Sequence, residues 1–225
     1  LVVLTGDHAE SLGEHGELTH GYFAYSSTLW VPLIMTGPGI SPGRSGEDVC
    51  HVDIFPTICD VLGAEKPRFL QGVSLLPLTK GKKLEKRAIY FESLEPFYNM
   101  GCAPLRGLIE EKKKYFDTPR PEFYDLEKDF NEEWNLIEKI NPESYQKKLK
   151  ALMEELSSAW KGESAQKVDR ETQEKLRSLG YVASLAPDLR ENYGPEDDLK
   201  TFLPLHEKLN RAIMANDEGR TEESI

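Results

Sequence analysis

The sequence has no uninterrupted run of 18 or more apolar residues, so it predicts no transmembrane helix. It also contains little cysteine. Cys50, Cys59 and Cys102 form no Cys-x-x-Cys pair and show no Cys/His spacing typical of a metal site. We therefore expect three buried free thiols, and neither a disulfide framework nor a zinc cluster.

The sequence also contains fewer basic than acidic residues. The 39 Asp and Glu residues outnumber the 28 Lys and Arg residues, and the formal net charge is -11. This balance argues against a nucleic-acid partner and against an anionic membrane surface. The length of 225 residues suits one full domain or two small ones. Leu1 falls inside a predicted core strand and Ile225 inside an amphipathic pattern, so we expect a piece of a longer protein.

The first 20 residues contain the candidate site. Residues 1–4 are apolar and include the β-branched Val2 and Val3, which predicts a strand buried on both faces, as in a parallel sheet. Catalytic groups in open α/β sheets collect just past the carboxyl ends of strands. Asp7 and His8 occupy that position, and both are good metal-binding side chains. His20 follows a loop whose glycines allow the tight turns that would return it to the same place.

The remaining elements follow from apolar periodicity and turn residues. We expect a short helix or turn over 23–29, a strand over 31–35, and a helix from Asp53 or Pro56 to a C-cap at Gly63. Four short β-type runs predict a small antiparallel meander. They are residues 87–93, 103–109, 114–117 and 122–126. Helices are expected over 142–160 and 170–179.

The other polar residues near the site have structural explanations. We interpret His15 as a loop-packing histidine and His51 as a structural residue before a helix. Residues 112–114, three lysines, are expected to form a solvated strand edge. Three acidic residues are expected to cap or solvate the loop, namely Glu10, Glu14 and Glu17.

Several motifs resemble the sulfatase branch of the alkaline-phosphatase-like superfamily. That family has an apolar strand followed by Ser/Thr-x-Asp-His-Gly-Glu, Leu-Gly-Glu-His-Gly, Val-Pro-Leu-Ile and Gly-Pro-Gly. The matching segments here are residues 5–10, 12–16, 31–34 and 37–39, with Ala9 in place of the usual glycine. Further segments resemble the family at residues 51–57, 72–78, 114–115 and 122–136. The resemblance covers roughly the first 140 residues.

The resemblance implies an α/β fold. The chain would be the C-terminal part of an alkaline-phosphatase-like α/β/α sandwich, with a small antiparallel sheet subdomain and C-terminal helices. We expect the sulfatase core over 1–83, the small sheet with packed helices over 84–183, and a linker over 184–199. Residues 200–225 are similar to the start of a tetratricopeptide repeat, which would offer a surface for a protein partner.

The resemblance also implies roles for the site residues. Asp7 and His8 would bind a divalent cation, with calcium expected first and zinc or manganese suited by nearby imidazoles. His20 stands where many family members have lysine, and would contact the transferred group and protonate the leaving oxygen. In the related phosphoethanolamine transferases, a histidine at this spacing binds metal instead. The substrate would be a small-molecule or glycan sulfate ester. Family members, many of them bacterial, often act outside the cytoplasm.

The family's nucleophile motif, Cys/Ser-x-Pro-x-Arg, does not occur at its expected place upstream of the metal loop. Residues 102–106 fit its letters, but they match a Pro-Leu-Arg-Gly-Leu strand that the family has at this point. We therefore predict that this chain alone turns over no sulfate ester. Two alternatives remain open: a phosphoethanolamine transferase or phosphodiesterase of the same superfamily, and a catalytically dead interaction module that acts through its helical repeats.

Overall fold

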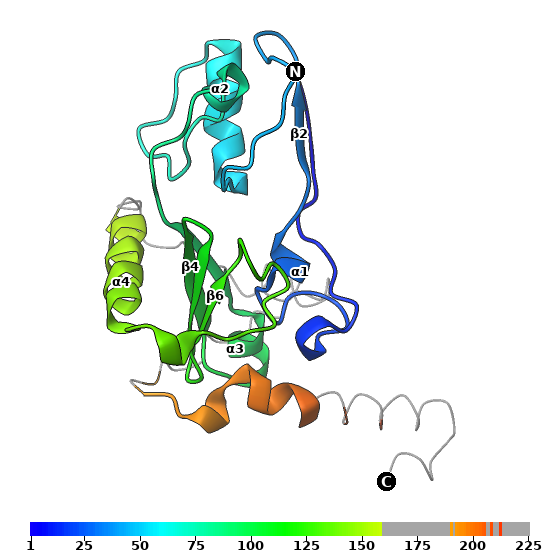
Figure 1. The fold of residues 1–225 in the computed structure, drawn as a ribbon, viewed down its shortest axis with the longest axis vertical. Helices are drawn as coiled ribbons and strands as arrows, with labels where there is room; N and C mark the ends of the chain where they lie inside the picture. Colours follow the sequence, from blue (N-terminus) through cyan, green and yellow to red (C-terminus); the bar gives the residue numbers. More distant parts are fainter. Residues whose placement is uncertain (159–189, 191, 206–207, 209–211, 213–225) are drawn as a thin grey trace, which may run out of the picture.

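A computed structural model of the chain describes residues 1–158, 190, 192–205, 208 and 212. Two regions lie one above the other in Figure 1. The upper region contains strands β1 (Val2–Thr5) and β2 (Leu33–Thr36) beside helix α2 (Ile54–Leu62). The lower region contains a four-stranded sheet with helices on both of its faces. The loop that contains Asp7, His8 and His20 leaves β1 and descends to the lower region.

The first strand differs from the prediction. β1 pairs antiparallel with β2, with Leu4 opposite Ile34, and these two strands form a sheet of their own. Val2 is 62% exposed and Leu4 is 54% exposed. The expectation of a parallel strand buried on both faces is therefore wrong for the described residues. An apolar run indicates that something can cover a strand, but it specifies neither the covering layer nor the direction of the neighbouring strand.

Helix α2 forms as predicted and is fixed by Asp53. The helix ends at Gly63, whose φ of 64° is the left-handed C-cap conformation that glycine adopts without steric cost. Asp53, fully buried, accepts hydrogen bonds from the backbone nitrogens of Cys50 and Val73, both at 2.9 Å, and from the Arg87 guanidinium. This carboxylate therefore joins the start of α2 to the later segments that contain Val73 and Arg87.

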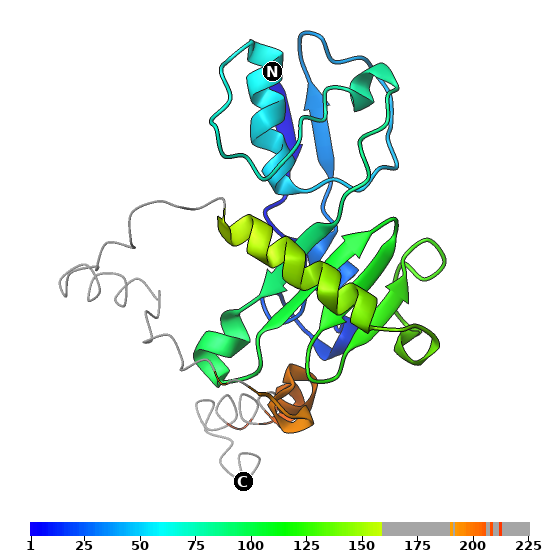
Figure 2. The same ribbon diagram turned by 90° about the vertical axis from the view of Figure 1, so that its left-hand side faces the viewer.

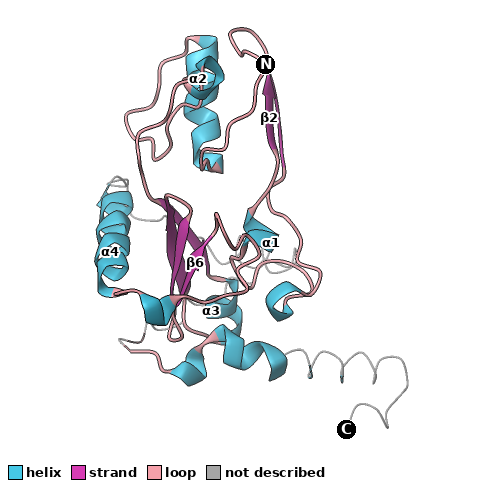
Figure 3. Ribbon diagram, in the orientation of Figure 1, coloured by secondary structure: helices cyan, strands magenta, loops and turns pink. Residues whose placement is uncertain are grey.

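The small sheet is the predicted antiparallel meander. Its order is β3 (Ile89–Ser93), β4 (Leu105–Glu110), β5 (Lys113–Asp117) and β6 (Glu122–Asp125), and every neighbouring pair is antiparallel. Helix α3 (Glu95–Met100) lies in the connection between β3 and β4. Figure 3 shows this sheet as the largest block of strands in the chain.

Two hydrophobic clusters sandwich the small sheet. Helix α4 (Glu143–Ser158) covers one face, where Leu149 packs against side chains of the sheet (Leu108, Tyr115 and Phe123). Figure 2 shows α4 lying across that face. The opposite face is covered by Phe23 and Tyr25 from the loop before helix α1 (Ser26–Leu29), and by Leu199 and Leu203. The alternation of side chains along each strand supplies both clusters.

Lys114 corrects a second expectation. Its side chain is 1% exposed, so it does not belong to a solvated strand edge. β5 is an inner strand of the sheet, and Lys114 points to the face that Tyr25 covers, where its Nζ also lies over the rings of the strand residues Phe91 and Phe116. Its ammonium group lies 2.6 Å from the buried carboxylate of Glu132. Burial lowers the pKa of Lys114, since it penalises the charged form.

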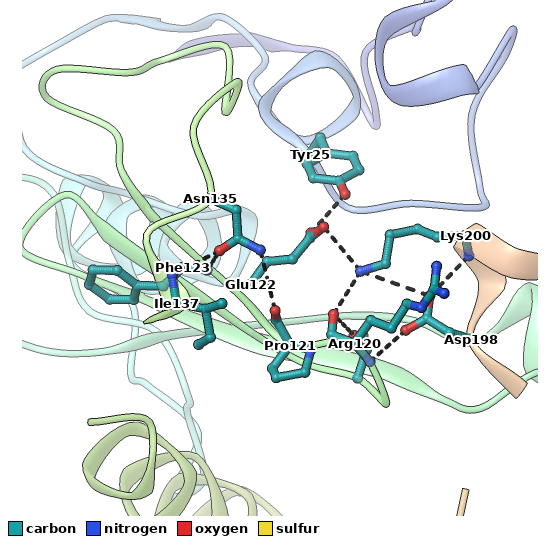
Figure 4. Close-up of polar contacts among 10 residues, drawn as sticks. Tyr25, Arg120, Pro121, Glu122, Phe123, Asn135, Ile137, Asp198 and Lys200 are labelled. Carbon is teal, nitrogen blue, oxygen red and sulfur yellow. Dashed lines mark hydrogen bonds and ion pairs between the residues drawn. The ribbon is translucent and has the colours of Figure 1, made fainter. Parts of the chain in front are cut away.

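The segment 192–205 packs against the small sheet. Residues 199–205 are helical, and Leu199 and Leu203 are buried. Figure 4 shows how Lys200 bridges this segment to the sheet. Its Nζ donates to the Arg120 carbonyl oxygen at 2.8 Å and lies 3.0 Å from Glu122, which also accepts a hydrogen bond from the Tyr25 hydroxyl at 2.7 Å. The residues around 199 and 200, where the predicted linker meets the predicted repeat, are therefore docked on the small sheet.

Parts of the predicted C-terminal architecture lie outside the described residues. They are the helix over 170–179, the first part of the linker (residues 184–189, and residue 191), and most of the repeat over 200–225. Within the described residues, no helix has both the length and the apolar character that crossing a bilayer requires.

Candidate active site

The loop between β1 and α1, which we call the site loop (residues 6–25), is held by a buried acid. Glu17 is 1% exposed, and its carboxylate accepts hydrogen bonds from the backbone nitrogens of Tyr22 at 2.8 Å and Phe23 at 3.1 Å. Burial raises the pKa of Glu17, although these two hydrogen bonds oppose the shift. Of the two expected roles, capping or solvating the loop, Glu17 therefore has the first: it caps two backbone nitrogens of the loop from inside.

Backbone hydrogen bonds fix the rest of the site loop. The nitrogen of Ala9 donates to the carbonyl of Thr28 in α1 at 2.9 Å, and the nitrogen of Ser11 donates to that of Thr19 at 2.9 Å. Gly13, with φ of 119°, makes the turn between them. The second of these bonds brings the two arms of the loop together, so that the residue after Thr19 returns beside the residues that follow β1.

Three side chains meet where the arms of the site loop come together. The ligand atoms of His8, Glu10 and His20 all lie within 4.8 Å of one another, and all three residues are exposed. The rings of His8 and His20 stack with centroids 3.7 Å apart and planes inclined by 25°. Two imidazoles and a carboxylate at such distances form a donor set that suits a divalent cation.

The hydrogen bonds of the two histidines specify which ring nitrogen faces the site. His8 Nδ1 lies 2.9 Å from the Ala9 carbonyl oxygen, and His20 Nδ1 lies 2.9 Å from Glu10 Oε2. A carbonyl and an ionised carboxylate can only accept, so each Nδ1 carries the proton. In the neutral rings, both Nε2 atoms then keep a free lone pair for a metal or a proton.

Asp7 lies beside this cluster, but it does not belong to the group of residues whose ligand atoms are all within 4.8 Å of one another. Its Oδ1 accepts a hydrogen bond from the backbone nitrogen of His8 at 3.1 Å, and its Oδ2 lies 3.8 Å from His8 Nε2. The hydrogen bond from the His8 backbone lowers the pKa of Asp7, and the nearby imidazoles add to this effect. The carboxylate is 92% exposed and ionised at neutral pH, so it is available as an oxygen ligand.

Sequence reasoning did not assign Glu10 to the site. The expectation for Glu10 is that it caps or solvates the loop, whereas its carboxylate is the partner of His20. The i, i+2 spacing from His8 is a signal that could have identified it, because alternate side chains of an extended segment share one side. Its pairing with His20 depends on the return of the loop, which spacing alone does not specify.

The remaining histidines have the structural positions that were expected. His15 stacks on Tyr25 with ring centroids 3.6 Å apart, and its Nε2 lies 3.0 Å from the Asn131 carbonyl oxygen. His51 Nε2 lies 2.8 Å from the Gly6 carbonyl oxygen. These contacts tie the site loop to the segment that follows β6, and the end of β1 to the start of α2.

Cys102 does not behave as a nucleophile. It is 2% exposed within the hydrophobic cluster that contains Phe23 and Phe116. Burial raises the pKa of its thiol to about 11, so the thiol stays protonated at neutral pH. The Cys-x-Pro-x-Arg letters of residues 102–106 therefore lead into strand β4, in agreement with the strand expected there.

Comparison with known proteins identifies the family. The family model described as N-sulphoglucosamine sulphohydrolase, C-terminal, matches residues 13–159. The chain belongs to the sulfatase family. Among curated relatives, the Δ4,5-hexuronate-2-O-sulfatase of Bacteroides thetaiotaomicron is 28% identical over 200 residues, which cover 85% of this chain and 42% of that protein. The choline-sulfatase of Rhizobium meliloti is 31% identical over 193 residues, with coverages of 80% and 37%.

Solved structures support the alkaline-phosphatase-like fold. The protein BT4656, solved in complex with its substrate D-glucosamine-2-N,6-O-disulfate, has a TM-score of 0.54 and 28% identity, and the match covers 71% of this chain and 34% of that one. The phosphonate monoester hydrolase of Agrobacterium radiobacter has a TM-score of 0.54 and 26% identity, with coverages of 68% and 35%. The chain spans about two fifths of the length of the two curated relatives named above.

Proposed function

We propose that this chain supplies the metal-binding and leaving-group side of the active site of a sulfatase that hydrolyses sulfate monoesters. The observation that carries this proposal is the meeting of His8, Glu10 and His20 at the end of β1, next to the ionised Asp7. The family membership supports the same reaction class.

Sulfate ester hydrolysis breaks the bond between sulfur and the ester oxygen, and the departing oxygen takes up a proton. Asp7 and His8 would hold a divalent cation, which would neutralise charge on the sulfate oxygens. His20, with its Nδ1 proton held by Glu10 and a second proton on Nε2, would donate the Nε2 proton to the departing oxygen. Glu17 and the backbone hydrogen bonds of the site loop hold these side chains in place before substrate arrives.

The nucleophile is proposed to come from a segment that these 225 residues do not contain. Cys102 is buried, and no other Cys or Ser stands in a Cys/Ser-x-Pro-x-Arg motif. The chain alone is therefore predicted to bind metal weakly and to leave sulfate esters intact. A sulfated sugar is the substrate class that we propose first, because two of the relatives act on sulfated carbohydrate.

Phosphorus esters are the second candidate substrate. The phosphonate monoester hydrolase has a fold similarity equal to that of BT4656. A transferase or phosphodiesterase would use the same metal ligands, with His20 recruited as a further ligand. Protein binding through the C-terminal repeat stays a separate prediction, since most of residues 200–225 lie outside the described part of the chain.

Metal binding and turnover can be tested separately. Calorimetric titration of the chain with Ca²⁺, Zn²⁺ and Mn²⁺ should show binding that is weakened at least about tenfold in Asp7→Asn and His8→Ala. The exposed Glu65→Gln variant is the control and should bind as the parent does. The full-length protein should then cleave sulfated monosaccharides faster than phosphate diesters. Unchanged metal affinity in both variants, or a preference for phosphate diesters, would overturn the proposal.

A further inference from the structure

We infer that Glu10 is a positioning residue that sets the orientation and tautomer of His20. This inference deepens the proposed function, on which the role of His20 rests. The His20 side chain is 44% exposed, so the surrounding protein constrains its ring only in part. Its ring has two described contacts, the Glu10 carboxylate at 2.9 Å and the stacked ring of His8. Stacking restrains the plane of the ring, but it still allows the ring to flip by half a turn about the Cβ–Cγ bond.

The hydrogen bond to Glu10 removes this freedom. An ionised carboxylate accepts and cannot donate, so Glu10 selects the form of His20 that has its proton on Nδ1. It also selects the ring orientation that places Nδ1 toward Glu10 and Nε2 on the opposite side. His8 is held in the same way by the Ala9 carbonyl oxygen. In both stacked rings, an acceptor on the site loop therefore binds the Nδ1 proton and leaves Nε2 available.

The position of Glu10 makes this role specific to it. Ala9, its neighbour, is bonded through its nitrogen to Thr28, which anchors the backbone beside Glu10 to helix α1. Glu14, the next acid of the loop, is occupied elsewhere, since its Oε2 accepts from the backbone nitrogen of Leu12 at 2.6 Å. Glu17 is buried and bonded to backbone. Among the acids of the site loop, Glu10 is the one whose carboxylate contacts His20.

The tautomer can be observed directly by long-range ¹H–¹⁵N correlation spectra of the 225-residue chain at a pH where His20 is neutral. We expect the parent to have the proton on Nδ1 of His20. Glu10→Ala should shift His20 toward the Nε2–H form, and Glu10→Gln should retain the parent form, because its amide oxygen can still accept. Glu14→Gln, a matched change in the same loop, should leave the spectrum of His20 unaltered.

The full-length protein provides the second readout. With a sulfate monoester, Glu10→Ala should lower kcat by about 10- to 100-fold with little change in KM, and Glu10→Gln should recover much of it. If the protein shows no sulfatase activity, the proposed function fails while the tautomer result still decides the role of Glu10. An unchanged tautomer in Glu10→Ala overturns the inference. So does loss of metal affinity with the tautomer unchanged, which would make Glu10 a ligand.

Discussion

The ammonium group of Lys114 lies 2.6 Å from the Glu132 carboxylate, and both side chains are almost completely buried. Glu132 also accepts a hydrogen bond from the backbone nitrogen of Ser26 at 2.5 Å. The pair thus connects an inner strand of the small sheet to the first residue of α1, which directly follows the site loop. An interior salt bridge therefore determines where the site loop is attached to the rest of the chain.

Breaking this pair should be costly. Lys114→Met leaves the Glu132 carboxylate buried without its counter-ion, and we expect the free energy of unfolding to fall by about 3–5 kcal/mol. Urea denaturation followed by circular dichroism measures the loss. The double variant Lys114→Met with Glu132→Gln should lose less than the single variant. Lys86→Met, at an exposed ion pair with Glu111, is the control and should unfold like the parent.

Asp53 predicts a pH dependence of stability. Burial alone would raise its pKa, but hydrogen bonds from Arg87, Val73 and Cys50 outweigh burial, and the net pKa lies below the ordinary value of 3.8. A carboxylate with a lowered pKa stabilises the fold above its unfolded pKa and loses that contribution as the pH falls through the folded value. Asp53→Asn should therefore cost about 3 kcal/mol at pH 7.

The difference between Asp53→Asn and the parent should shrink below about pH 4, because the parent's own Asp53 then becomes protonated. Urea midpoints measured for both proteins between pH 7 and pH 2.5 test this. A difference that stays constant through the acid range would show that Asp53 acts through packing and not through its charge.

The bridge made by Lys200 should couple the C-terminal segment to the site loop. Lys200→Met leaves Glu122, 8% exposed, with the Tyr25 hydroxyl as its remaining described side-chain partner, at a cost of about 1.5–3 kcal/mol. Amide hydrogen exchange should become faster both in residues 199–205 and in the segment that contains Tyr25. Lys128→Met, at a lysine that is 80% exposed, should leave exchange unchanged in both segments. Acceleration restricted to 199–205 would argue against coupling.

Gly107 should tolerate no side chain. A Cβ atom added there would lie 2.2 Å from the Tyr115 carbonyl oxygen and 2.3 Å from the Phe91 ring. To make room for the methyl group, strand β5 and the Phe91 ring would both have to move. Gly107→Ala should therefore destabilise the chain by about 3 kcal/mol or more. Gly43→Ala is the matched control, since its Cβ would meet no atom within 4 Å. Thermal melts that shift equally for the two variants would contradict the packing of β4.

Local patterns predicted the regular elements well. The cap at Gly63 and the apolar spacing of residues 54–62 predict α2, and four short β-type runs predict β3 to β6. These features depend on neighbours in sequence, so composition and spacing carry the information. Asp7, His8 and His20 were chosen from their motif, and the structure brings His8 and His20 into contact.

The features that sequence reasoning missed depend on distant parts of the chain. Lys114 was expected at a solvated edge, because three consecutive lysines give no sign that Glu132 will lie beneath the second strand of a hairpin. The pairing of Glu10 with His20 spans ten residues and requires the turn at Gly13. Likewise, the exposure of β1 is set by which layers lie against it, and a run of four apolar residues does not encode those layers.

The exposure of β1 has a practical consequence. Val2 and Leu4 project from the same side of β1, and Ile34, the cross-strand partner of Leu4, is 60% exposed. Exposed apolar side chains on a two-stranded sheet favour binding of another strand or of a second copy of the chain. At millimolar concentrations the purified chain should therefore associate with itself, and its melting temperature should change on dilution.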